Sequence, residues 1–119
     1  MKTKLTVTNA NMLEGELILE TAESIEGLSP RGQMLVDSDN LSFIYLMEKD
    51  EVYIYISLPE EIWGDLKNGL GQPVNVFLQS NGSRVEMDNF YNELEYLIEN
   101  IKGNGNYGDE MVAKVESIF

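Results

Sequence analysis

Four consecutive polar residues, Asp37-Ser38-Asp39-Asn40, form the most metal-like stretch of this sequence. Oxygen atoms at alternate positions are what a hard cation such as calcium requires, so the stretch resembles the opening of a calcium loop. The continuation departs from such a loop, because Leu41-Ser42-Phe43 stands where a third ligand and a glycine belong. We therefore expect a turn stabilised by Asx side chains. Asp37 and Asp39 are the only candidates for metal ligands.

A glycine-rich run, Gly103-Asn104-Gly105-Asn106-Tyr107-Gly108, matches the G-x-G-x-x-G motif of dinucleotide-binding proteins. That motif requires a strand before its first glycine and an acidic residue about 20 positions later. Here an amphipathic segment of helical period precedes the run, and the sequence ends at Phe119. The run instead predicts a connection between two helices, in which Gly103 terminates the first.

Acidic side chains could in principle form the paired carboxylates of a hydrolase. The clusters available are Glu60 with Glu61, and Glu93 with Glu95 and Glu99, and both are expected on solvated helix faces. The chain has no cysteine and no histidine, which excludes thiol and histidine nucleophiles, Cys/His zinc sites and disulfides. We predict no catalytic residue and no cofactor.

Charge narrows the range of partners. The 119 residues include 8 basic and 21 acidic side chains, which gives a net charge of −13 and a pI near 4.1. Such a surface repels phosphate groups, so we expect neither nucleic acid nor a membrane as partner. Residues 1–7 alternate polar and apolar types instead of forming a signal peptide, and we predict a cytoplasmic protein. The length predicts one domain, 1–119.

The elements that would position these residues follow from periodicity and turn residues. Strands are predicted at 4–8, 16–22 and 33–37, with a loop over 23–32. Asn81-Gly82 predicts a hairpin of 73–79 with 84–88. Helices are predicted near 59–70, with a capping box formed by Ser57 and Glu60, and at 90–102 and 109–119.

A second hairpin joins 41–48 to 51–58, since only Lys49-Asp50 separates two runs rich in β-branched and aromatic residues. A two-residue loop at Lys49-Asp50 would place Leu46 opposite Tyr53 and Ile44 opposite Tyr55. One face of this hairpin is entirely apolar and belongs to the core. It consists of Leu41, Phe43, Tyr45, Met47, Val52, Ile54, Ile56 and Leu58.

The other face of that hairpin carries Ile44, Leu46, Tyr53 and Tyr55. Either a helix of the same chain or another subunit is expected to cover it. Tyrosines combine apolar area with a hydroxyl group and are common at protein interfaces. These four residues are therefore interface candidates for a homodimer, and the exposed side of the last helix, ending in Phe119, is another.

Three segments also carry a family resemblance. They are 27–29, Leu35-Val36-Asp37-Ser38-Asp39-Asn40-Leu41-Ser42-Phe43, and Glu99-Asn100-Ile101 followed by Asn106-Tyr107-Gly108 and Glu110. The sequence resembles the YjbL-like family, small acidic proteins of Bacillus-type bacteria without an assigned function. The resemblance covers 27–119. It implies a cytoplasmic bacterial protein and supplies no site residues.

The strands precede the helices, which favours an α+β fold with more strand than helix. We expect one largely antiparallel sheet of six or seven strands, curved or partly closed into a barrel, with the C-terminal helices packed on it. An open sheet with all helices on one face is the alternative. For function, the first hypothesis is a non-enzymatic interaction or regulatory domain with a protein partner or a second copy. A small-molecule or divalent-metal-binding domain is the alternative, and a carboxylate-dependent hydrolase is the third.

Overall fold

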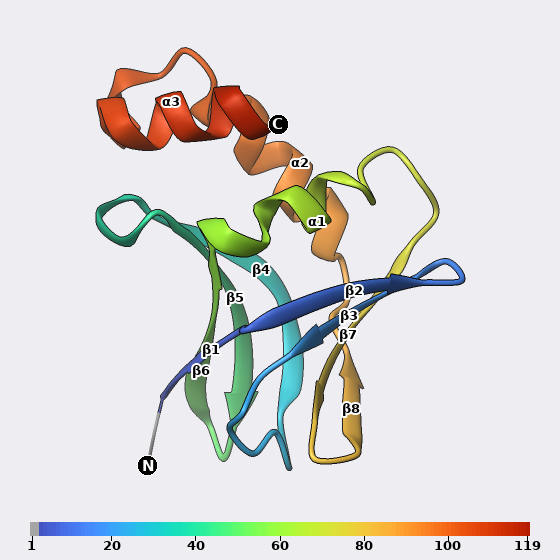
Figure 1. The fold of residues 1–119 in the computed structure, drawn as a ribbon. Coiled ribbons are helices and arrows are strands. Elements are labelled where there is room, and N and C mark those ends of the chain that lie inside the picture. Colours follow the sequence, from blue (N-terminus) through green and yellow to red (C-terminus); the bar gives the residue numbers. More distant parts are fainter. Residues whose placement is uncertain (1–2) are drawn as a thin grey trace.

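The computed structural model describes residues 3–119, so residues 1 and 2 of the alternating amino-terminal stretch lie outside the described residues. The fold is α+β with more strand than helix, as predicted (Figure 1). The strands are β1 Lys4–Thr6, β2 Asn9–Leu13, β3 Glu16–Glu20, β4 Ser29–Asp37, β5 Ser42–Lys49, β6 Val52–Pro59, β7 Asn75–Ser80 and β8 Ser83–Glu86. The helices are α1 Trp63–Lys67, α2 Phe90–Ile101 and α3 Asp109–Ile118, with 3₁₀ turns η1 Ser38–Asn40, η2 Glu60–Ile62 and η3 Gly105–Tyr107.

The strands form two separate sheets of four. Sheet A has the order β1-β6-β5-β4 and sheet B the order β2-β3-β7-β8. The pairs β1/β6 and β3/β7 are parallel, and the others are antiparallel. The prediction of a single sheet of six or seven strands, or of a partly closed barrel, is therefore wrong. Within residues 3–119 no helix is long and apolar enough to cross a bilayer.

The division into two sheets arises where the chain passes from one sheet to the other. The Val7 N–H donates to the carbonyl of Ser57 in sheet A, at 3.0 Å, and the Thr8 N–H donates to the carbonyl of Glu20 in sheet B, at 2.8 Å. The strand predicted at 4–8 thus ends early, and the asparagine-rich stretch after it, where no strand was predicted, becomes β2. Alternation predicts extended backbone, but it does not say which sheet a residue joins.

The core fills the space between the two sheets and beneath the helices. Alternate residues of each strand point inward, because successive side chains of a strand leave opposite faces. The contributions of the four central strands are Phe43, Tyr45 and Met47 of β5, Ile54, Ile56 and Leu58 of β6, Leu17 and Leu19 of β3, and Val76 and Leu78 of β7. The apolar face predicted for the 41–58 hairpin is thus confirmed at its centre.

The register of that hairpin differs from the prediction by two residues. Leu46 pairs with Tyr55 and Ile44 with Ser57, and the turn is formed by Asp50 and Glu51. Both turn residues have positive φ, 51° and 65°, although neither is the glycine or asparagine that normally marks such a turn. Because a slip of two residues preserves the face of every side chain, the predicted faces remain correct.

An aromatic cluster fastens the helices to one end of the sheets. Trp63 at the start of α1 is completely buried, and its ring lies 5.0 Å from that of Phe43 and 5.8 Å from that of Phe119, between centroids. The Trp63 Nε1–H donates to the carbonyl of Leu58 at 3.0 Å. The predicted capping box is wrong, because Ser57 lies within β6 and no side chain caps η2 or α1.

Helix α2 runs beside β4 and closes its free edge. The Met34 N–H donates to Glu93 Oε1 at 3.0 Å, and Asn89 Nδ2 donates to the carbonyl of Gly32 at 3.2 Å. Helix α3 makes its main contacts with α1, α2, η1 and η3, so of the two C-terminal helices α2 is the one packed mainly on a strand. In Figure 1 the helices gather at the upper end of the strands.

We predict that Asp50→Asn combined with Glu51→Gly stabilises the protein by about 1 kcal/mol, because Asn-Gly adopts positive φ at both turn positions with little strain. The free energy of unfolding in urea measures the effect. Asp50→Asn with Glu51→Gln is the matched control, since it removes the same two charges without a glycine. Equal stabilisation by both pairs would assign the gain to charge and contradict the prediction.

Candidate functional site

The outer face of sheet A carries a contiguous apolar and aromatic surface, which we call the tyrosine face. The β5/β6 and β4/β5 pairings place Leu46 beside Tyr55 and Ile44 beside Leu35. Leu35 and Tyr53 are each 47% exposed and Tyr55 is 38% exposed, whereas Ile44 and Leu46 are buried between them. The tyrosine face consists of Leu35, Ile44, Leu46, Tyr53 and Tyr55.

The part of the chain that the structure describes leaves this face without a helix over it. The buried side chains of α2, Phe90, Leu94, Ile98 and Ile101, all belong to the core between the sheets, and none of the five tyrosine-face residues does. Of the two covers that the sequence left open, a helix of the same chain is therefore absent from residues 3–119. Four of the five interface candidates, Ile44, Leu46, Tyr53 and Tyr55, come together here.

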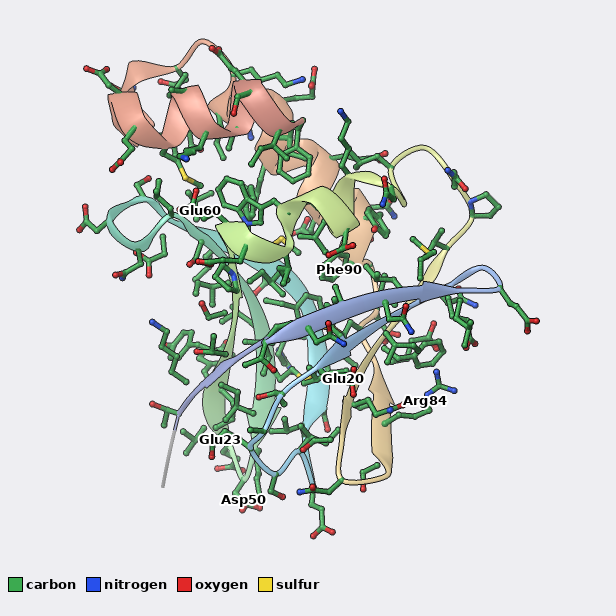
Figure 2. The ribbon with its side chains drawn as sticks, in the orientation of Figure 1. Glu20, Glu23, Asp50, Glu60, Arg84 and Phe90 are labelled. Carbon is green, nitrogen blue, oxygen red and sulfur yellow. The ribbon has the colours of Figure 1, made fainter. Side chains whose placement is uncertain are left out.

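Charges on this face are few and balanced. Lys4 of β1 pairs with Tyr55, and Asp37 of β4 pairs with Ser42. Arg31 Nη1 lies 3.4 Å from Glu48 Oε1. Two bases thus stand with two acids on a chain whose net charge is −13. Further acids lie at the ends of the strands: Asp39, in η1, follows Asp37, and Asp50 and Glu51 form the hairpin turn, where Figure 2 shows Asp50 remote from Glu60 and the helices.

The outer face of sheet B provides the contrast within the same molecule. Its aromatic residue, Phe77, is covered by the Arg84 guanidinium, whose central carbon lies 4.1 Å from the ring centroid. Arg84 Nη2 also lies 3.2 Å from Glu16 Oε1, and Figure 2 shows Arg84 on this side of the molecule. The other exposed or partly exposed side chains include the polar residues Asn9, Asn11, Glu20, Asn75, Gln79 and Glu86, and also Leu13 at the end of β2, which is 59% exposed. Sheet B therefore shields its aromatic ring and exposes Leu13 only at the end of β2, whereas sheet A exposes Leu35, Tyr53 and Tyr55 around a buried apolar centre.

Phe119 does not join the tyrosine face. Its ring lies 6.2 Å from Phe43 and 5.8 Å from Trp63, between centroids, and it packs against the core. Sequence reasoning also missed Leu35. The alternation of Leu35 with Met34 and Val36 could have revealed it, because those two neighbours point toward the core.

The metal candidates Asp37 and Asp39 lie at η1. Asp37 Oδ2 accepts a hydrogen bond from Asn40 Nδ2 at 2.9 Å, which agrees with an Asx-stabilised turn, and Asp39 is exposed. Glu48 occupies the twelfth position counted from Asp37, but the extended β5 carries it away toward Arg31. Among residues 3–119 no three acidic side chains are grouped so as to hold a metal ion.

The predicted acidic clusters do not form a pair of carboxylates around a site. Glu60 Oε2 lies 3.3 Å from Lys114 Nζ, and Glu99 Oε2 lies 3.9 Å from Lys102 Nζ. Glu93 accepts from the backbone of β4. Glu60 and Glu93 therefore link separate elements, whereas Glu99 pairs with a neighbour at the end of its own helix, α2.

The glycine-rich run connects α2 to α3 through η3, as predicted. Gly103 has a φ of +71° just after the end of α2. Its N–H donates to Glu116 Oε2 at 2.8 Å, and Asn104 Oδ1 accepts from the Asn106 N–H at 3.1 Å. The run follows a helix instead of a strand, and a carboxylate already occupies the Gly103 N–H, which disfavours the dinucleotide interpretation.

A groove of about 510 Å³ lies at the start of α2 and is lined in part by Glu86, Asp88 and Tyr91. The Tyr91 hydroxyl donates to the carbonyl of Leu66 at 2.8 Å, and the Tyr45 hydroxyl donates to that of Asp88 at 2.7 Å. Burial raises the pKa of both hydroxyls above the ordinary value of 10. Both groups therefore act as neutral donors that hold α1 and the start of α2 in place.

Comparison with known proteins gives one consistent result. A family model described as UPF0738, a family of unknown function, matches residues 5–119. A UPF0738 protein of Bacillus licheniformis is 44% identical over 121 residues, which span 100% of this chain and 99% of the relative. One of Bacillus cereus is 41% identical over 122 residues, spanning 100% and 99%. One of a Geobacillus species is 49% identical over 96 residues, spanning 81% and 77%.

The resemblance to uncharacterised proteins of Bacillus-type bacteria is thus confirmed, and it is broader than predicted, because it includes the first 26 residues. No solved structure matches this chain.

We predict that stability declines as pH rises above 10, because Tyr45 and Tyr91 ionise in the unfolded chain at a lower pH than in the folded one. The stability that these two hydroxyls contribute is complete below the pKa that they have in the unfolded chain. It is lost as the pH rises toward their higher pKa in the folded protein. Tyr91→Phe should flatten this decline, measured by urea unfolding at about pH 8 and 11. Tyr96→Phe, at a position 65% exposed, should leave the decline unchanged. An unchanged slope in Tyr91→Phe would refute the assignment.

We predict that calcium and magnesium raise the melting temperature equally, through screening of the acidic surface. Scanning calorimetry in matched chloride salts is the measurement. A selective site would instead raise the melting temperature with one of the two cations only, and the increase would grow with the free concentration of that cation. An increase of several degrees in melting temperature with calcium but not with magnesium would contradict the prediction. If the double variant Asp37→Asn/Asp39→Asn abolished that increase, the η1 turn would bind the calcium ion.

Proposed function

Because the chain belongs to UPF0738, a family of unknown function, we propose its role from its geometry: a non-enzymatic, cytoplasmic protein-interaction domain that docks through the tyrosine face. We also interpret this family as the YjbL-like group that the sequence resembles.

The observation that carries the proposal is the difference between the two outer sheet faces. Two tyrosines and a leucine, Tyr53, Tyr55 and Leu35, expose large apolar areas side by side on sheet A. On sheet B an arginine covers the aromatic ring, and the exposed leucine, Leu13, lies apart from it at the end of β2. Contiguous apolar surface is uncommon on a monomer and marks sites of association. Tyrosine is enriched at such sites because its ring supplies contact area and its hydroxyl keeps a polar partner.

The form of the surface suits protein recognition better than catalysis. It is formed by central strands, and Ile44 and Leu46 fill its middle, so it is rigid and offers area rather than a concave pocket. Small-molecule sites are concave and enclose most of their ligand. An apolar centre with a polar border is instead the anatomy of a protein interface.

The test compares three immobilised forms of the protein in a Bacillus-type lysate: wild type, Tyr55→Arg and Tyr96→Arg. Tyr96 is the matched control, because it is 65% exposed on α2, outside the tyrosine face. We expect at least one protein to be retained by wild type and Tyr96→Arg and lost with Tyr55→Arg, at unchanged melting temperature.

Identical retention by all three forms would overturn the proposal. If Tyr55→Arg unfolds, Leu35→Lys takes its place, since Leu35 lies on the edge strand β4 and is 47% exposed.

A further inference from the structure

Building on the proposed function, we propose that the occupant of the tyrosine face is a second copy of this chain, held face to face in a weak homodimer. Charge, the state of the sheet edges and the available area support this occupant.

The first support is electrostatic. Two copies that each carry −13 repel one another, so they associate best where the fewest uncompensated carboxylates meet. On the tyrosine face the bases Lys4 and Arg31 stand with the acids Glu48 and Asp37. A strongly basic partner would be drawn to the acidic remainder of the surface, whereas the balanced face is the place where a like-charged copy can approach.

The second support concerns how the copies can meet. Sheet A cannot readily extend across its β4 edge, because Glu93 and Asn89 of the α2 region already bind the Met34 N–H and the Gly32 carbonyl. Its other edge, β1, is only three residues long. Exposed edges are where strands of two molecules would otherwise pair. With both edges of sheet A unsuitable, association through this sheet is face to face.

The third support is the area. Strand β5 has eight residues and sheet A has four strands, so the face measures roughly 27 by 19 Å, or about 500 Å² per copy. Two copies would bury roughly 1,000 Å² together, at the small end of specific interfaces. Interfaces of this size are typical of weak, transient association.

Sedimentation equilibrium tests the inference over about 1 to 200 µM protein. We expect the mass to rise from 13.5 kDa toward twice that value. Tyr55→Arg, which a symmetric dimer contains twice, should raise the dissociation constant at least about tenfold. Tyr96→Arg should leave it unchanged, and Leu35→Lys should weaken the dimer if Tyr55→Arg does not fold.

Salt provides an independent readout. If the face is neutral and the rest of the surface repels, raising sodium chloride from about 0.05 to 0.5 M should lower the dissociation constant. A dissociation constant that rises with salt would overturn the charge argument.

The failures of the two proposals are distinguishable. A wild type that stays at 13.5 kDa throughout, yet retains a different lysate protein through Tyr55, would overturn the homodimer and leave the interaction domain standing. A dimer that Tyr55→Arg and Leu35→Lys leave unchanged would overturn the face as its interface. A monomer without Tyr55-dependent partners would overturn both.

Discussion

Trp63 is completely buried where β6 gives way to α1, and its ring packs between Phe43 of β5 and Phe119 at the end of α3. Its indole N–H is tied to the β6 carbonyl of Leu58. This cluster joins three elements that are far apart in the chain and holds α1 and α3 at one end of the strands. Helix α2 adds to that arrangement by lying beside β4. Because α1 and α3 pack at one end of the strands and α2 packs beside the edge strand β4, no helix of the described residues covers the outer face of sheet A.

Much of the local structure follows from the sequence. Asn81-Gly82 predicted the β7–β8 hairpin with its register, Ser80 opposite Ser83, and apolar periodicity predicted α2 and α3 to within one residue. The larger arrangement did not follow, because the β1/β6 and β3/β7 pairings depend on which sheet each strand joins. The two-residue difference at the turn had a local cause: Glu51 adopts positive φ at the position where such a turn normally has glycine.

The sequence predicted four residues of the tyrosine face, but it did not show which further residues belong to that face and which do not. Strand alternation puts Ile44 with Leu46 and Tyr53 with Tyr55, and the two pairs share a face in both the predicted and the observed register because the two registers differ by an even number of residues. Leu35 required the knowledge that β4 lies beside β5. Phe119, at the end of an amphipathic helix, resembles an exposed anchor in sequence, but the aromatic cluster draws it inward.

The two parallel pairings have a consequence for the order in which the protein can form during translation. Leu5 pairs with Ile56, and Ile18 pairs with Phe77. Strands β1 and β3 of the nascent chain therefore have no parallel partner until β6 and β7 have left the ribosome. Meanwhile β5 and β6, joined by a two-residue turn, can pair at once and expose an apolar face that sheet B later covers. The β5–β6 hairpin is thus the natural nucleus, and until sheet B closes it is also the segment most in need of chaperones.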